Sequence, residues 1–151
     1  MEEKLLKFLL KARTKTYAGE EGKVKPVFKG SKQLEYREGD WFYRDVYYSE
    51  KRIFMGIEVV YYKNNPVFAM SYYGSFRGMR EKEIDKILRK ALTEKWQTTR
   101  IWKKVEWEKG DYKYVCQPDF EGSIEEMAGS ETIFKKGKEV YKFFYAGGLI
   151  A

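Results

Sequence analysis

The spacing of apolar and polar positions divides the chain into two similar series of elements. Apolar residues at helical spacing, such as Leu5, Phe8 and Leu9, predict an amphipathic helix near the N-terminus. Ile84 and Leu88 begin a second pattern of the same kind. Runs rich in tyrosine, phenylalanine and β-branched residues follow each helix and predict strands. We therefore predict an α+β fold with two helices and a mainly antiparallel sheet.

Turn signals place two β-hairpins after each helix. Glu-Gly-Asp at 38–40 and Lys-Gly-Asp at 109–111 separate aromatic runs, as expected for the first hairpin of each series. Asn64-Asn65 and Gly137-Lys138 are predicted to form the turns of the second hairpins, because Asn and Gly tolerate positive φ.

Three pairs of segments match in the same order along the chain. They are 5–12 with 84–91, 34–43 with 105–114, and 56–74 with 129–147. These matches predict an internal duplication within a single domain of residues 1–151, with one half at about 1–78 and the other at about 79–151. The halves differ mainly in the connection 15–32, which is longer in the first half, and at Asp45, whose counterpart is Cys116.

Composition removes several classes of function. The chain has no histidine, which excludes Ser-His and Cys-His catalysis and the usual histidine-based metal sites. The glycines at 19–23 do not fit the phosphate-binding loop pattern. We therefore expect no catalytic residue, no metal and no cofactor. These absences favour a protein that is not an enzyme.

Charge and cysteine usage indicate the environment. The net charge is +7, but charged residues make up 35% of the chain and both signs are interleaved, so a solvated charged surface explains the net charge better than a nucleic-acid partner does. Cys116 is the only cysteine and cannot form an internal disulfide, which favours a reducing compartment. No apolar run is long enough to span a membrane, so we expect a cytoplasmic protein without a membrane partner.

Glu58 and Glu131 occupy matching positions in the repeated hairpins. With the turns placed as above, Glu58 shares an outer sheet face with Tyr73, and Glu131 shares one with Phe144. These outer faces are too apolar to be freely solvated. Three interpretations follow: a shared cleft that holds a cationic or aromatic ligand, a homodimer interface, or glutamates paired with Lys or Arg across strands.

Two further features single out the first half. Asp45 is in strand phase with Tyr43, so it is either ion-paired, for example to Arg44 or Arg52, or lines a site. The long connection 15–32, which includes Tyr17, is either functional or a plain surface excursion.

Several stretches together resemble a known family. They are Thr16-Tyr-Ala-Gly19, Glu35-Tyr-Arg-Glu-Gly-Asp40, Tyr43-Arg-Asp-Val-Tyr47, Gly56-x-Glu58, Met70-Ser-Tyr-Tyr-Gly74 and Tyr145-Ala-Gly-Gly148. The family is a domain of unknown function of bacteria and archaea, found alone or behind a helix-turn-helix segment in regulators. It has Met-Asn-Tyr where this chain has Met70-Ser71-Tyr72, and it implies no activity. The duplicated plan is also loosely similar to the drug-sensing effector domains of bacterial regulators, which hold cationic compounds with aromatic residues and a glutamate.

The sequence thus favours a non-catalytic ligand-binding or sensor-like module. A homodimeric interaction domain is the alternative, and nucleic-acid binding is a weaker one. The residues expected to bind the ligand are Glu58, Glu131, Tyr73, Phe144, Tyr43, Asp45 and Tyr17.

Overall fold

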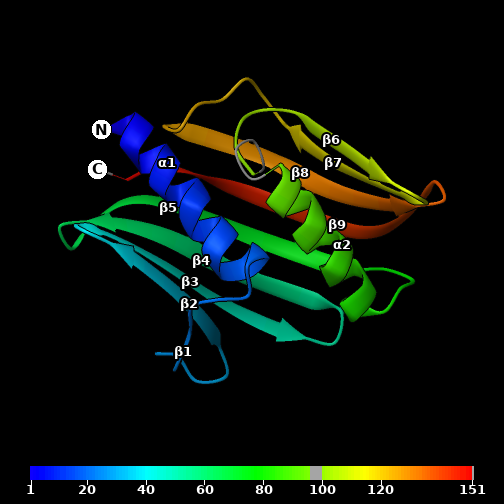
Figure 1. Ribbon diagram of the computed structural model, residues 1–151, viewed down its shortest axis with the longest axis horizontal. Coiled ribbons are helices and arrows are strands. Elements are labelled where there is room, and N and C mark those ends of the chain that lie inside the picture. The colour runs from blue at the N-terminus through cyan, green and yellow to red at the C-terminus, as the bar shows by residue number, and fades with distance from the viewer. Residues whose placement is uncertain (96–99, 151) are drawn as a thin grey trace.

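The computed structural model describes residues 1–95 and 100–150 (Figure 1). Its elements are, in chain order, α1 (Glu2–Arg13), a π-helical turn (Thr14–Ala18), β1 (Lys23–Val24), β2 (Lys32–Glu38), β3 (Trp41–Glu50), β4 (Ile53–Tyr62), β5 (Asn65–Phe76), α2 (Glu81–Glu94), β6 (Val105–Lys109), β7 (Tyr112–Pro118), β8 (Glu126–Lys135) and β9 (Lys138–Leu149). Both predicted helices and the antiparallel hairpins are present, which confirms the α+β class.

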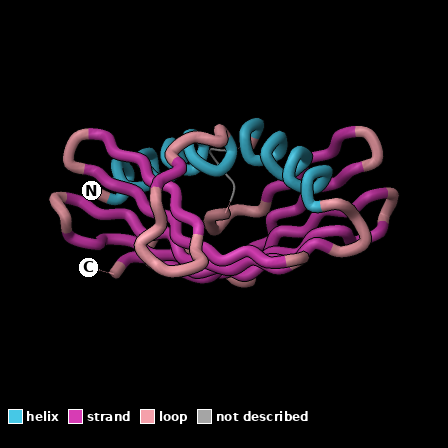
Figure 2. Tube along the Cα trace, turned by 90° about the horizontal axis from the view of Figure 1, so that it is seen from below, coloured by secondary structure: helices cyan, strands magenta, loops and turns pink. Residues whose placement is uncertain are grey.

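The nine strands form one antiparallel sheet in the order β1-β2-β3-β4-β5-β9-β8-β7-β6. The two hairpin series meet where β5 pairs with β9, so the last strand of each series lies at the centre of the sheet. Figure 2 shows that the sheet is curved and that both helices lie on its concave side. The opposite, convex face carries no helix among the described residues.

The helices attach to the concave face through apolar stripes. Leu5, Leu9 and Ala12 of α1 are buried, as are Ile84 and Leu88 of α2. They pack on the side chains that the strands direct to the same side, because alternate strand residues face opposite sides of a sheet. Neither α1 nor α2 has the length and hydrophobicity of a helix that crosses a bilayer.

The turns of the second hairpins lie one residue earlier than predicted. Tyr62 pairs with Asn65, so Lys63 and Asn64 form the turn, with φ of 49° and 66°. Lys136 and Gly137 form the other turn, with φ of 49° and 78°. Both residues of each turn have positive φ, as tight two-residue hairpin turns require.

The faces predicted for β4 and β8 were wrong, whereas β5 and β9 direct Tyr73 and Phe144 to the outer, convex face as predicted. Glu58 pairs with Met70 rather than Ser71, and the register then shifts at a β-bulge between Val60 and Tyr61. A slip of one residue moves a side chain to the other face of the sheet. Glu58 consequently lies on the concave, helix-covered face.

The second hairpin shows the same correction. Glu131 pairs with Phe143, and a bulge between Ile133 and Phe134 matches the bulge in the first hairpin. Glu131 and Phe143 are both fully buried on the concave face. Phe144 is about half exposed on the convex face, so it does not share a face with Glu131.

Candidate functional site

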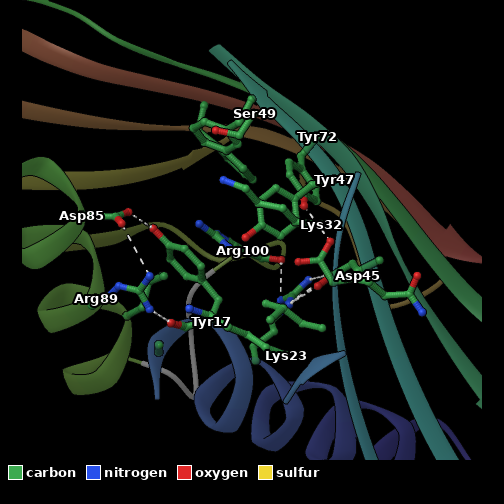
Figure 3. A pocket seen from close by; sticks show the side chains of 18 of the residues that line it. Tyr17, Lys23, Lys32, Asp45, Tyr47, Ser49, Tyr72, Asp85, Arg89 and Arg100 are labelled. Carbon is green, nitrogen blue, oxygen red and sulfur yellow. Dashed lines mark hydrogen bonds and ion pairs between the residues drawn. The ribbon is translucent and has the colours of Figure 1, made fainter. Parts of the chain in front are cut away.

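A cavity of about 490 Å³ lies between the concave face of the first half and the helical layer. Its sheet side is formed mainly by β2, β3, β4 and β5, and its helical side by the end of α1, the π-helical turn and α2. The segment 23–32, within the longer connection of the first half, also contributes to its wall. Figure 3 shows Tyr17 on the helical side and Asp45 and Tyr72 on the sheet side.

Glu58 lies in the wall of the cavity but is already neutralised. Arg13, at the end of α1, donates from Nε to Glu58 Oε1 at 3.0 Å and forms a further hydrogen bond through Nη2. The hydroxyl of Tyr43 donates to Glu58 Oε2 at 2.7 Å. A buried carboxylate needs such partners because its transfer from water is costly. Arg13 reaches Glu58 from a helix, so the predicted cross-strand pairing is not how this charge is balanced.

Glu131 has the same kind of environment in the second half. Arg100 Nε donates to Glu131 Oε1 at 2.8 Å, and Tyr114 donates its hydroxyl to the other carboxylate oxygen. The guanidinium of Arg100 also stacks over Phe143, at 4.5 Å from the ring centroid. Glu131 is fully buried and is not part of the cavity wall. The two glutamates therefore do not offer their charges to a shared cleft.

Asp45 is a buried acid of the cavity wall that has no basic partner among the described residues. It is 7% exposed and lines the cavity, with Glu58 as its neighbour on β4. Tyr72 donates its hydroxyl to Asp45 Oδ1 at 2.6 Å. Across residues 1–95 and 100–150, no Lys or Arg forms an ion pair with Asp45. Arg44, one of its two expected partners, pairs instead with Glu35.

The electrostatics of Asp45 follow from this placement. Burial, reinforced by the negative charge of Glu58, raises the pKa of Asp45 to about 7. The hydrogen bond from Tyr72 and the charges of Arg100 and Arg13 lower it by less. Asp45 is therefore close to half-protonated at neutral pH, and a cation in the cavity would favour its ionised form.

Tyr17 forms part of the opposite wall. Its hydroxyl donates to Asp85 Oδ1 at 2.6 Å, and Arg89 lies over its ring at 4.5 Å from the centroid. Arg89 also forms an ion pair with Asp85 at 3.5 Å. Burial and the nearby carboxylate of Asp85 raise the pKa of Tyr17 well above its ordinary value. Tyr17 is thus a fixed, neutral aromatic wall.

In the second half, the position that matches Asp45 is Cys116, and it does not face an open cavity. Cys116 pairs with Glu131 as Asp45 pairs with Glu58, and it is fully buried. Tyr145, at the position that matches Tyr72, donates its hydroxyl to the backbone carbonyl of Ile101 at 2.7 Å. Burial raises the pKa of the Cys116 thiol to about 11. The chain itself occupies the space that is open in the first half.

Two matching glycines allow this arrangement. A Cβ on Gly56 would lie 2.7 Å from the hydroxyl of Tyr72, and a Cβ on Gly129 would lie 2.6 Å from that of Tyr145. Any side chain at either position would displace a tyrosine that orients the neighbouring group. The glycines that recur in the sequence are therefore explained by close approach in the strand interior.

The structure brings together four of the seven residues expected at the site. Asp45, Glu58, Tyr43 and Tyr17 line the cavity, whereas Glu131 lies outside its wall. Tyr73 and Phe144 lie on the convex face, where they are direct neighbours on β5 and β9. Sequence reasoning missed several wall residues, among them Lys23, Lys32, Tyr47, Tyr72 and Arg100. The strand phase of Tyr47 with Asp45 is a signal that would have found it.

Fold and site together define an α+β protein whose single curved sheet encloses a polar and aromatic cavity beneath two helices. The chain belongs to the family of the domain of unknown function DUF5680, whose model matches residues 45–150. Asp45, Glu58 and Tyr72 fall within the matched segment, whereas Arg13 and Tyr17 precede it. Searches of curated proteins and of solved structures gave no match. Among the described residues, no three acidic or cysteine side chains gather as metal ligands.

Proposed function

We propose that this protein is a non-catalytic binding module for a small organic cation, held by Asp45 in the cavity of the first half. The observation that carries the proposal is a buried acid that lines an aromatic cavity and has no basic partner among the described residues. An uncompensated buried carboxyl is costly in the empty protein. A protonated amine would supply the missing counter-charge.

The cavity suits an amine attached to an aromatic or aliphatic body. Its volume falls within the range usual for small-molecule sites, roughly 300–1,000 Å³. Tyr47, Phe54 and Phe76 supply aromatic wall around the acid. Ring faces attract cations and also pack against flat apolar groups. The nearby guanidinium groups of Arg13 and Arg100 do not oppose such a ligand strongly, because Glu58 and Glu131 neutralise them.

Repeated structural detail supports the internal duplication that the sequence predicts. Glu58 and Glu131 each accept a hydrogen bond from a strand tyrosine and an ion pair from an arginine. The two bulges, at Val60/Tyr61 and Ile133/Phe134, occur at matching positions. We infer that residues 1–151 are one domain of two related halves, one of which kept an open site.

The sensor-like role rests on the same cavity. Binding would ionise Asp45 and change the charge beneath α1 and the π-helical turn, which are the elements nearest the N-terminus. A coupling of this kind would suit a regulator, in line with the family context that the sequence resemblance implies. It requires no chemistry on the ligand.

A thermal-shift screen tests the binding proposal. Phenethylammonium and tetraphenylphosphonium represent amine and permanent-cation ligands, and phenethyl alcohol is the neutral counterpart of the first. We expect at least one cation to raise the melting temperature of the wild type while the alcohol does not. Calorimetry then gives the affinity of that cation.

Two variants decide whether Asp45 is responsible. Asp45→Asn keeps the shape of the side chain and removes its charge, so it should weaken binding of the stabilising cation at least 10-fold. Glu38→Gln removes an exposed acid whose partner, Lys11, lies outside the cavity, and it should leave binding unchanged. Absence of stabilisation by any cation, or equal binding by wild type and Asp45→Asn, would refute the proposal.

A further inference from the structure

The convex face of the sheet carries a connected apolar surface. Tyr48 pairs with Met55, Met55 with Tyr73, and Tyr73 with Phe144, so these side chains form one row across four adjacent strands. The convex surface also includes two isoleucines of β4. Its six large members, each between 41% and 53% exposed, are Tyr48, Ile53, Met55, Ile57, Tyr73 and Phe144.

Charge is nearly absent from the centre of this surface. On β4 from 53 to 59, on β5 from 69 to 75 and on β9 from 142 to 148, Lys142 is the only charged residue that faces the convex side. Its ammonium group donates to Thr132 and lies over the ring of Phe144. A chain in which 35% of residues are charged thus keeps its central strands neutral on one side. Depletion of charge with enrichment in aromatic residues and methionine is typical of the core of a protein interface.

We propose that the convex face is the interface of a homodimer, in which the row from Tyr48 to Phe144 packs against the same row of a second copy. A neutral surface can meet itself without like-charge repulsion, as a two-fold interface requires. The surface is centred on β4 and β5, next to the middle of the sheet, and it reaches β3 on one side and β9 on the other.

The area is sufficient for a stable dimer. Half-exposed side chains of this size each present on the order of 80–100 Å², so the six together present roughly 500 Å². The small residues between them, Ala69, Ser71 and Ala146 among others, raise this to roughly 700 Å² per copy. Stable interfaces bury roughly 600–1,000 Å² per partner, so an area of roughly 700 Å² per copy lies within their range. A nucleic acid, by contrast, would need several Lys and Arg side chains on the surface that it contacts.

Sedimentation equilibrium and light scattering on the full chain test the proposal. We expect a dimer at about 50 µM, a concentration well above the Kd of standard interfaces. Phe144→Glu and Tyr73→Glu each place a charge opposite its own copy and should raise the dissociation constant at least 100-fold. Phe120→Glu changes an aromatic side chain of similar exposure in a loop outside this row and should leave the dimer intact.

Circular dichroism establishes that each variant is folded. Ser71→Cys adds a measurement that does not depend on destabilising substitutions, because a thiol at the centre of the interface should form a disulfide between copies under mild oxidation. A wild-type monomer at about 50 µM, or a dimer that Phe144→Glu and Tyr73→Glu leave intact and Ser71→Cys does not cross-link, overturns the proposal. A monomer that instead binds lipid vesicles through this face also overturns it. The cavity lies on the other face, so none of these results bears on the binding of cations.

Discussion

Asp45 and Cys116 occupy matching positions in the two halves of the molecule, and their surroundings differ. Each is paired in register with a buried glutamate and adjoins a strand tyrosine. In the first half that tyrosine, Tyr72, holds the carboxyl of Asp45 at the wall of a cavity. In the second half Tyr145 holds the backbone of Ile101, and the space is filled.

The comparison distinguishes the contacts that stabilise both halves from the features on which a function of the first half would depend. The arginine–glutamate pair and its tyrosine occur in both halves, so we infer that they join α1 in the first half, and the connection that follows α2 in the second half, to the sheet. Among the described residues, the acid at position 45 and the cavity in front of it belong to the first half, and the matching position in the second half holds Cys116. Under the duplication that we propose, a specific function is placed at the features that one half alone retains.

The largest effects that we expect are the losses of stability when each of the two buried ion pairs is broken. Glu131→Gln leaves the Arg100 guanidinium buried without a counter-charge, and we expect a loss of about 3–5 kcal/mol in the free energy of unfolding. Glu58→Gln should cost less, roughly 1–3 kcal/mol, because Asp45, its neighbour on β3, can ionise and supply a counter-charge near Arg13, whereas Cys116, the matching neighbour of Glu131, is a neutral thiol. Urea denaturation measures both. Equal losses would contradict the distinction between an open and a closed half.

The pH dependence of stability isolates Asp45. Its pKa is about 7 in the folded protein against 3.8 ordinarily, so the folded state retains a proton that the unfolded chain releases. The free energy of unfolding should therefore fall as pH rises from about 4 to about 8, by about 2–4 kcal/mol from this residue. Asp45→Asn should remove that part of the dependence. Parallel pH profiles of wild type and variant would show that Asp45 titrates normally.

Removing the hydroxyl of either matching tyrosine, Tyr72 or Tyr145, should change the stability by a smaller amount. Tyr145→Phe leaves the buried carbonyl of Ile101 without its donor and should cost about 1–3 kcal/mol. Tyr72→Phe should cost about 1 kcal/mol or less, since Asp45 can be solvated from the cavity, and should raise the pKa of Asp45 further. Denaturation gives the energies and carboxyl NMR gives the pKa. A pKa of Asp45 that falls in Tyr72→Phe would contradict the assigned hydrogen bond.

The helices, the strand succession and the hairpins could be predicted from the sequence because they depend on local patterns. The faces of β4 and β8 could not, because the β-bulges at Val60/Tyr61 and Ile133/Phe134 shift the register by one residue and so reverse these faces relative to β5 and β9. Hydrophobicity did not correct the error, since one face is covered by helices and the other carries the exposed row with Tyr73 and Phe144. Both faces therefore look apolar in the sequence.

The candidate site was only partly predictable for a related reason. Asp45 stood out as an acid in an aromatic strand, and Tyr17 stood out because it lies in the long connection 15–32. Arg13 and Arg100 did not, because each reaches its glutamate from an element remote in the chain. Whether a strand acid is neutralised depends on such long-range contacts, which no local pattern encodes.

The most direct measurement of the difference between the halves is the reactivity of a thiol at the two matching positions. Asp45→Cys places a second thiol in the chain, and 2-aminoethyl methanethiosulfonate can modify both, with mass spectrometry of the peptides following each one. We predict that the thiol at position 45 reacts at least about 100-fold faster than Cys116, which is buried and has a raised pKa. Similar rates at the two positions would contradict the account of one open and one closed half.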